Sequence, residues 1–282
     1  MRIVSFGEPG REKPGVVIGD EIVDVCAVDP RLPETVRGIL EAGLLQELEH
    51  IATAAPASSR LRLASGGLAS PITSPSKIIC LGRNYVEHAE EQDQAAPDYP
   101  LLFSKGPNVL CGDGAAVPYP ADTQELDFEA EMAFVVGRRA KAVPQDEAWD
   151  YIAGYTVFID LSARDLQRNE KQWFRGKSFD SGGPCGPWLV TRDEVPAPHN
   201  LAISMDVDGE TMQSSNTGRM TFTVDFLLSH ISRTMTLEPG DIVATGTPAG
   251  VGAFRDPPRF LGPGSELTAT VESIGTLTCT IA

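Results

Sequence analysis

The segment "LDFEAEMAFVVG", Leu126–Gly137, joins alternating acids to an uninterrupted apolar run. Alternate side chains of an extended strand point to the same side, so Asp127, Glu129 and Glu131 would share one face. The run that follows is apolar at odd and even positions alike, which predicts a strand buried on both faces. A half-exposed strand with an acidic outer face is the simpler alternative. Buried acids, by contrast, need a partner that neutralises them.

Similar strand-like runs recur from Lys77 to Gly275, separated by turns that contain proline or glycine. An Asp208-Gly209 pair within this region is typical of a hairpin. Only a few segments there favour helix, namely Tyr85–Gln94, Gln145–Tyr151, Ser162–Gln172 and Val224–Thr234. Many strands with few helices predict a β-rich α+β fold with a closed or rolled sheet.

The first part of the chain has a different pattern, which predicts a small α+β domain at residues 1–70. Two apolar runs flank the Gly19-Asp20 pair, which is a hairpin signal. Residues 34–54 carry apolar side chains at helical spacing. A stretch rich in Ala, Ser, Pro and Gly follows and predicts the connection to the main domain, residues 71–282.

The composition excludes several classes of protein. The 282-residue chain has a formal net charge of −16, and a surface this acidic argues against nucleic-acid or anionic-membrane partners. No run approaches the ~18 apolar residues that a membrane helix needs, and the first ten residues lack the apolar core of a signal peptide. The five cysteines form no Cys-x-x-Cys pair, which is typical of reduced thiols. We therefore expect a cytoplasmic protein.

A fourth acid, Asp160, ends another apolar strand-like run, "YTVFID". Side chains at the ends of neighbouring strands can converge, so Asp160 could join the acids of the first segment at one buried place. Several carboxylates gathered there need a cation to be stable together. Oxygen ligands favour Mg²⁺, Mn²⁺ or Ca²⁺ over zinc. The pattern therefore predicts a divalent-metal site.

The segment "GRNYVEHAEE", Gly82–Glu91, directly follows a predicted strand. If it is helical, His88 and Glu91 are i, i+3 neighbours on one face. A carboxylate that orients an imidazole makes a general base that can take a proton from water. The alternative is a surface histidine beside acids, which is common in acidic proteins.

Polar groups suited to an anionic ligand follow Asp160. In "DLSARDLQ", Arg164 and Gln167 are i, i+3 neighbours, and Lys177 lies in a glycine-flanked loop further on. Such groups can bind a substrate carboxylate or an oxyanion. An ordinary surface turn with an exposed lysine is the alternative.

The segment "GDIVATGTPAGVG", Gly240–Gly252, is a predicted strand that runs into a glycine-rich loop. It is not a phosphate loop, because no Gly-Lys-Ser/Thr follows. Thr245, Thr247 and the free backbone N–H groups could still line a pocket for an acidic substrate.

These motifs, in this order, resemble the fumarylacetoacetate hydrolase family. The resemblance runs from about Lys77 to the C-terminus and rests on "GRNY" with the following His and Glu, "LDFEAE", "DLSARDLQ", "KSF" and "GDIVATGTPAGVG". The segments "FGEPGREKPG" and "PPRFLGPG" resemble the bacterial branch that acts on 2,4-dioxo acids. The resemblance implies a mixed β-roll catalytic domain with a small N-terminal domain, assembled as a homodimer.

The resemblance also implies roles for individual residues. Its metal ligands correspond by position to Glu129, Glu131 and Asp160. Its catalytic groups correspond to His88, the partner acid Glu91 and the oxyanion-stabilising Lys177. Its substrate-contact positions are occupied by Arg83, Tyr85, Arg164, Gln167 and Thr247. Asp127 receives no role.

The expected reaction is hydrolytic cleavage of a C–C bond in a 2,4-dioxo acid, an acylpyruvate, to pyruvate and a second acid. Mg²⁺ is the expected metal, with Mn²⁺ or Ca²⁺ as alternatives, and His88 would activate the water. The same site would serve an oxaloacetate-type decarboxylase or a 2-hydroxyhepta-2,4-diene-1,7-dioate-type isomerase. A non-catalytic metal-binding protein is the alternative from another class. A nucleotide enzyme is not indicated, since neither glycine-rich fingerprint occurs.

Overall fold

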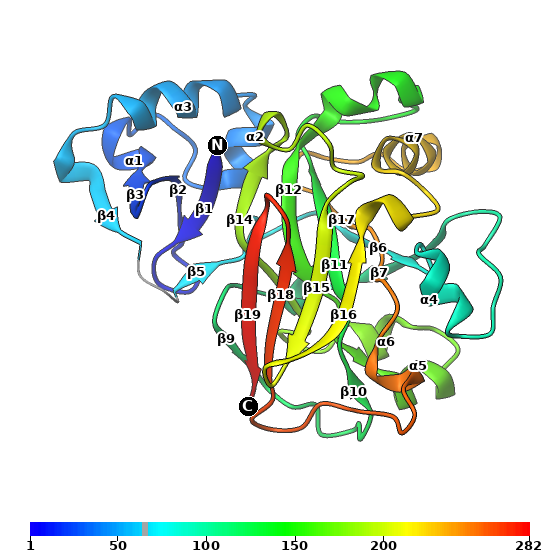
Figure 1. The fold of residues 1–282 in the computed structure, drawn as a ribbon. Helices are drawn as coiled ribbons and strands as arrows, with labels where there is room; N and C mark the ends of the chain where they lie inside the picture. The colour runs from blue at the N-terminus through cyan, green and yellow to red at the C-terminus, as the bar shows by residue number, and fades with distance from the viewer. Residues whose placement is uncertain (64–66) are drawn as a thin grey trace.

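Most strands of the computed structural model, which describes residues 1–63 and 67–282, belong to one 12-stranded mixed sheet (Figure 1). Its strands are β1 (Arg2–Phe6), β2 (Lys13–Ile18), β3 (Glu21–Asp24), β4 (Arg60–Arg62), β5 (Leu68–Ala69), β6 (Ile78–Gly82), β7 (Leu101–Lys105), β8 (Leu110–Cys111), β11 (Ala130–Val136), β12 (Ile152–Ile159), β14 (Gly183–Thr191) and β17 (Ile242–Ala244). The main path runs β4-β3-β2-β1-β14-β12-β11-β17-β6-β7. Because this path ends at β4 and β7, the sheet rolls without closing. The predicted β-rich α+β fold with a rolled sheet is confirmed.

A second sheet packs across the middle of the first. Its five strands are β9 (Ala115–Val117), β15 (Ala202–Val207), β16 (Glu210–Asn216), β18 (Glu266–Val271) and β19 (Gly275–Ile281). The order is β16-β15-β18-β19-β9, and β15 and β16 form the hairpin predicted at Asp208-Gly209. Its inward side chains, among them Met205 and Leu277, share one core with Met132 of β11. The short strands β10 (Leu126–Asp127) and β13 (Ser162–Ala163) pair with each other.

Strand β11 is buried on both faces, as its sequence predicts. Met132 and Phe134 belong to the core between the two sheets, whereas Ala133 and Val135 belong to a second core on the opposite face. Strand β12 covers one edge along the whole strand, and β17 covers the other edge at residues 133–135. Glu131 alternates with Met132 and therefore points into the interior on the side of Ala133.

The helices are short and are α1 (Val25–Val28), α2 (Val36–Glu41), α3 (Leu45–Thr53), α4 (Val86–Glu90), α5 (Arg164–Asn169), α6 (Phe174–Lys177) and α7 (Val224–Thr234), with a 3₁₀ helix, η3 (Gln145–Tyr151). Helix α7 has the predicted bounds. The helix predicted at 34–54 is split into α2 and α3, because Gly43 adopts a φ of 70° and ends α2. Helices α4 and α5 are shorter than predicted, and the expected loop around Lys177 is the single turn α6.

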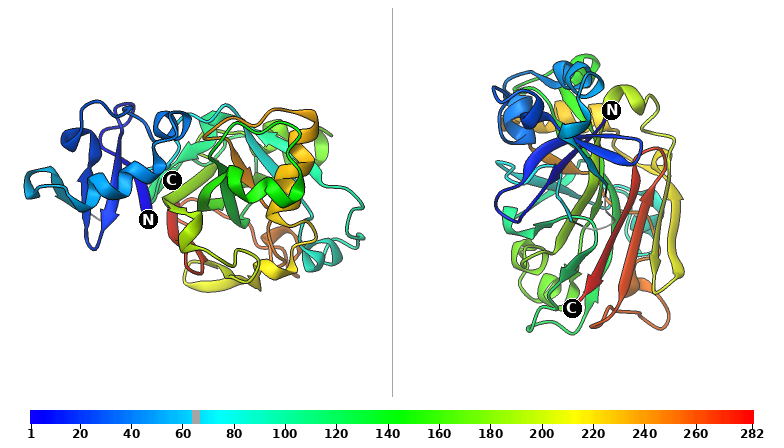
Figure 2. Two further views of the ribbon diagram at one scale, coloured as in Figure 1. Left: turned by 90° about the horizontal axis from the view of Figure 1, so that it is seen from above. Right: turned by 90° about the vertical axis from the view of Figure 1, so that its left-hand side faces the viewer.

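The N-terminal segment lies to one side of the molecule (Figure 2) and continues the main sheet. Strand β1 pairs with β14 through Arg2 and Ile3, and β2 and β3 form the hairpin predicted at Gly19-Asp20. Side chains of α2 and α3 share the second core with β11. A domain boundary at residue 70 stays a prediction. Within the described residues, every helix is too short or too polar to span a lipid bilayer.

Gly154 of β12 lies where the backbone of β14 comes closest. A Cβ atom at this position would lie 2.0 Å from the carbonyl oxygen of Val190, and a strand backbone cannot swing aside as a side chain can. We expect Gly154→Ala to lower the free energy of unfolding by about 2–3 kcal/mol, measured by thermal or denaturant unfolding. In the control Gly262→Ala, where no atom lies within 4 Å, the change should stay below ~0.5 kcal/mol. Equal midpoints for the two variants would contradict this packing.

Candidate active site

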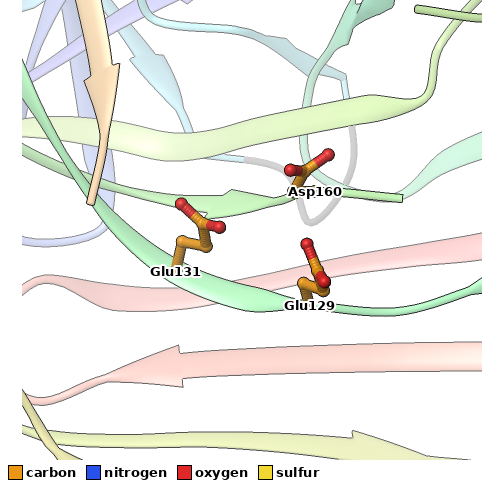
Figure 3. Close-up of side chains that lie close together, drawn as sticks. All are labelled: Glu129, Glu131 and Asp160. Atoms are coloured by element: carbon orange, nitrogen blue, oxygen red, sulfur yellow. The ribbon is translucent and has the colours of Figure 1, made fainter. Parts of the chain in front are cut away.

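Three buried acids meet where β11 begins and β12 ends (Figure 3). Glu131 lies opposite Phe158 in the β11–β12 ladder, and the N–H of Asp160 donates to the carbonyl oxygen of Glu129 at 2.9 Å. This register brings the side chains together, so that Glu129, Glu131 and Asp160 each offer an oxygen within 4.8 Å of the others. The cluster predicted from the sequence is therefore present.

Buried cations neutralise two of these acids. Lys177 Nζ lies 2.6 Å from Glu129 Oε2 and 2.8 Å from Asp160 Oδ2. Lys105 Nζ lies 2.6 Å from Asp160 Oδ1, and Arg164 Nη2 lies 2.6 Å from Glu129 Oε1. Burial alone would raise the pKa of Glu129, but the charges of Arg164 and Lys177 outweigh it and lower that pKa.

Glu131 is the acid of this cluster that forms no ion pair with these cations. Its Oε2 accepts a hydrogen bond from Gly246 N at 2.8 Å, and among the described residues no lysine or arginine pairs with it. Burial, followed by the charges of Asp160 and Glu129, raises the pKa of Glu131 well above its ordinary value. An acid cluster with one uncompensated carboxylate fits a divalent cation. Each carboxylate oxygen has two lone pairs, so Glu129 and Asp160 can bind a metal while keeping their hydrogen bonds.

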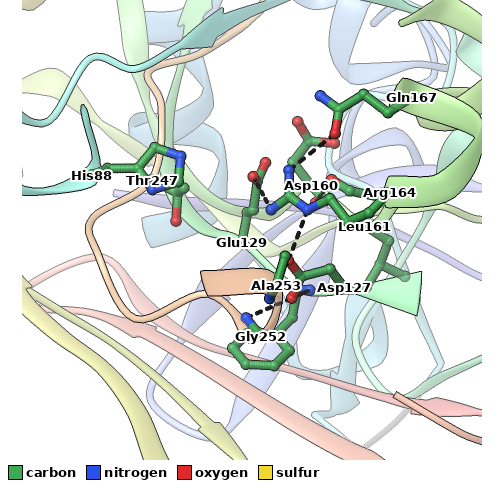
Figure 4. A network of polar contacts seen from close by, with 12 residues as sticks. His88, Asp127, Glu129, Asp160, Leu161, Arg164, Gln167, Thr247, Gly252 and Ala253 are labelled. Atoms are coloured by element: carbon green, nitrogen blue, oxygen red, sulfur yellow. Dashed lines mark hydrogen bonds and ion pairs between the residues drawn. The ribbon is translucent and has the colours of Figure 1, made fainter. Parts of the chain in front are cut away.

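Asp127 has a different role from the other acids of its segment. It is the last residue of β10, a strand separate from β11. Its carboxylate accepts hydrogen bonds from Gly252 N at 2.7 Å and Ala253 N at 3.1 Å (Figure 4). Arg164 Nε donates to it at 2.7 Å. Asp127 and Glu129 therefore both contact the guanidinium of Arg164, but Asp127 lies outside the close cluster of Glu129, Glu131 and Asp160. Asp127 instead holds Arg164 and the loop that contains Gly252 in place.

The His88–Glu91 pair predicted from the sequence is formed at the end of α4. His88 is buried, and its Nδ1 lies 2.5 Å from Glu91 Oε1. An ionised carboxylate can only accept, so Nδ1 carries the hydrogen and Nε2 is left as the basic nitrogen. Gln92 Nε2 lies 2.8 Å from His88 Nε2. Gly250 N donates to Glu91 Oε2 at 2.8 Å, which fixes the acid in turn.

A cavity of about 380 Å³ connects the two groups of residues. Its wall includes seven of the side chains that the sequence singled out, namely Arg83, His88, Glu129, Arg164, Gln167, Lys177 and Thr247. Apolar side chains form another part of the wall, among them Leu81, Phe103, Trp173 and Phe254. A volume of this order suits a small organic acid with some water.

Three predicted substrate-contact residues either bond to other protein groups or lie outside the cavity wall. Thr247 Oγ1 is occupied by hydrogen bonds to Ala130 O at 2.9 Å and from Gln213 Nε2 at 2.8 Å. Gln167 Oε1 accepts from Arg164 Nη1 at 3.1 Å. Tyr85 is fully buried and its hydroxyl has no hydrogen-bond partner. Direct substrate contacts for these side chains stay predictions.

Three buried polar residues of the site were missed in the sequence. Lys105 holds Asp160 and also donates to Leu161 O at 3.1 Å. Asn84 binds the backbone of Phe222 and Thr245, which anchors the start of α4. The third is Gln213. The one local signal in the sequence is the "GRNY" motif, in which Asn84 directly precedes the start of the predicted helix.

The whole chain was compared with known proteins. A family model described as "Fumarylacetoacetate (FAA) hydrolase C-terminal" matches residues 77–282. "Oxaloacetate tautomerase Fahd2a, mitochondrial" from Rattus norvegicus is 42% identical, over 98% of this chain and 90% of its own length.

Two solved structures are similar over nearly their full length. The fumarylacetoacetate hydrolase of Exiguobacterium antarcticum has a TM-score of 0.88 at 35% identity, covering 100% of this chain and 99% of that one. The 2-hydroxyhepta-2,4-diene-1,7-dioate isomerase of Mycobacterium marinum has a TM-score of 0.79 at 30% identity, covering 100% and 98%. The family match spans the acid triad, the His88–Glu91 pair and the glycine-rich loop. The chain therefore belongs to the fumarylacetoacetate hydrolase family.

Proposed function

We propose that this protein is a divalent-metal-dependent tautomerase that interconverts the keto and enol forms of a short 2-oxo dicarboxylic acid of the oxaloacetate type. The observation that carries the proposal is a cavity whose wall includes both His88, which is paired with Glu91, and Glu129, one of the three clustered acids Glu129, Glu131 and Asp160. The names of an oxaloacetate tautomerase and an isomerase among the similar proteins support this choice of reaction.

The acid triad would hold the metal, for which we propose Mg²⁺, with Mn²⁺ or Ca²⁺ as alternatives. When bound, such an ion withdraws electrons from the 2-oxo group of the substrate and makes the neighbouring C3 hydrogens more acidic. Arg164 and Lys177 keep Glu129 ionised, so this ligand is ready to bind without first losing a proton. Lys105 is not one of the residues that line the cavity, and its ammonium binds Asp160 and the backbone oxygen of Leu161.

His88 would carry out the proton transfer. Glu91 accepts the Nδ1 hydrogen, so Nε2 is the nitrogen available to the substrate. As substrate enters, the Gln92 amide would give up its place beside Nε2, and Nε2 would take a proton from C3. The imidazolium, stabilised by Glu91, would then release that proton to the 2-oxo oxygen. The enol forms without gain or loss of atoms, and the reverse sequence restores the keto acid.

Hydrolysis of an acylpyruvate was preferred from the sequence because the His88–Glu91 pair is present. That pair serves proton transfer at carbon equally well, so it does not separate the two reactions. The sequence assigned Lys177 to the oxyanion, but both hydrogen bonds of its ammonium go to Glu129 and Asp160. Because the similar proteins include an oxaloacetate tautomerase and an isomerase, we propose isomerisation as the main reaction and hydrolysis as the alternative.

The charge of the cavity supports a substrate with two carboxylates. The protein carries a net charge of −16, yet the cavity wall has a single acid, Glu129, and five cationic side chains, Arg83, Arg164, Arg168, Lys171 and Lys177. Arg168 is already paired with Glu125. Lys171 is exposed and has no acid within ion-pair distance among the residues described. A second carboxylate at the far end of the substrate would be attracted there.

The proposed reaction predicts hydrogen exchange at C3 of oxaloacetate. Protein with Mg²⁺ in D₂O should exchange these hydrogens faster than Mg²⁺ alone, as followed by NMR, and a chelator should remove the difference. His88→Asn should lower kcat by about 10²–10⁴-fold because the base is lost. Glu90→Gln, an exposed acid on the same helix, is the control and should stay near the wild type. Exchange at the rate of the metal alone would contradict the proposal, and cleavage of an acylpyruvate under the same conditions would favour hydrolysis.

If Lys171 binds the second carboxylate of the substrate, its removal should change KM for a dicarboxylate but not for a monocarboxylate. We expect Lys171→Met to raise KM for oxaloacetate by about 3- to 5-fold, the size of one exposed charge pair, and to leave KM for the monocarboxylate 2-oxobutanoate unchanged. Lys171→Arg should restore the dicarboxylate KM because it restores the charge. Equal KM changes for both substrates would show that Lys171 does not bind the second carboxylate.

Two further expectations accompany the proposal. All five cysteines are unpaired, which suits a reducing compartment, and we propose the cytoplasm. We also propose a homodimer, on the family resemblance alone. Fractionation of cells and light scattering of the purified protein test these two expectations.

A further inference from the structure

Strand β11 is paired with β17 along only part of its length, and the pairing stops near Glu129 and Glu131. Strand β17 pairs with β11 from Ala133 onward, and Thr245 continues the pairing by donating to Met132 O at 3.0 Å. The chain then turns away at Gly246, whose φ is 91°. Ala130, the residue between the two glutamates, therefore has no strand beside it on this edge. Glu129 and Thr247, which lie near this gap, both line the cavity.

Side chains replace the missing strand. Gln213 Oε1 accepts from Ala130 N at 2.9 Å, and Thr247 Oγ1 donates to Ala130 O at 2.9 Å. Gln213 Nε2 closes the ring by donating to Thr247 Oγ1 and to Pro248 O, both at 2.8 Å. Gln213 is 0% exposed and Thr247 is 3% exposed, so water does not compete for these bonds. Only one orientation of the amide fits, because Ala130 N must donate and Pro248 O must accept.

This ring joins the metal acids to the proton-transfer pair. The loop that contains Thr247 also donates Gly246 N to Glu131 and Gly250 N to Glu91. Gly250 packs closely against β16, since a Cβ there would lie 2.3 Å from Met212 O. The loop therefore touches Glu131 at one end and Glu91 at the other, and Gln213 is the side chain that fixes its middle to β11.

We propose that Gln213, which projects from the second sheet, is a positioning residue that holds Ala130 and the glycine-rich loop so that Glu129 and Glu131 converge on the metal while Glu91 stays behind His88. The inference rests on the proposed metal site and goes beyond the proposed reaction by giving the five-stranded sheet a part in it. Hydrogen-bond partners of ligand-bearing groups commonly change metal affinity by 10–100-fold when removed.

The test uses Gln213→Met, which keeps the length of the side chain and removes its hydrogen bonds. Titration of the full-length protein with Mn²⁺ alone should give a Kd raised by about 10-fold or more, and kcat at saturating Mn²⁺ should also fall because Glu91 loses its support. Thr247→Val, which removes one hydroxyl from the ring, should raise the Mn²⁺ Kd in the same direction. This second variant keeps the inference testable if Gln213→Met does not fold.

Met205→Leu is the matched control, because Met205 lies opposite Gln213 in the β15–β16 ladder and packs only in the apolar core. It should leave the Mn²⁺ Kd unchanged even where thermal stability falls. A wild-type Mn²⁺ Kd in folded Gln213→Met, or an equal loss in Met205→Leu, would overturn the inference. Mn²⁺ binding needs no substrate, so a failed tautomerase assay leaves this result standing. A wild type that binds no Mn²⁺ would overturn both proposals.

Discussion

An excess of negative charge in a dry interior is the constraint on which this site depends. Three buried cations, Lys105, Arg164 and Lys177, face four buried acids. Glu131 is left with one backbone N–H, which orients a carboxylate but brings no net charge. Because an unpaired buried charge costs several kcal/mol, the fully ionised cluster is stable only with a further cation. The raised pKa of Glu131 lets a proton balance the cluster, and a metal that replaces this proton fits the same charge balance as well as the resemblance to a family.

The glycine-rich loop distributes backbone donors among the acids that perform different tasks. Its N–H groups reach Glu131, Glu91 and Asp127, which are a metal acid, the partner of His88 and the anchor of Arg164. Such close approach requires glycine at defined points. A Cβ on Gly252 would lie 1.9 Å from a carbonyl oxygen, and Gly250 has a φ of 102°. One loop thus keeps the base and the metal acids in register.

The parts of the molecule that could be predicted from the sequence are those with a local signal. The β11 strand is apolar at every position of its second half, and acids beside such a run are rare enough to indicate a site. Lys105 gives no such signal, because it ends an ordinary strand and its partner Asp160 lies 55 residues further along the chain. Gln213 lies among polar residues of a hairpin, where nothing distinguishes a buried amide from an exposed one. Residues that act through distant backbone groups become visible only once the chain is folded.

The central claim is that one divalent cation is held by Glu129, Glu131 and Asp160. Diffraction from crystals grown with Mn²⁺, recorded near the manganese absorption edge, tests it most directly. This account predicts a single strong anomalous peak within about 2.0–2.4 Å of one oxygen from each of the three carboxylates. A map with no anomalous peak between the three carboxylates at saturating Mn²⁺ would contradict it.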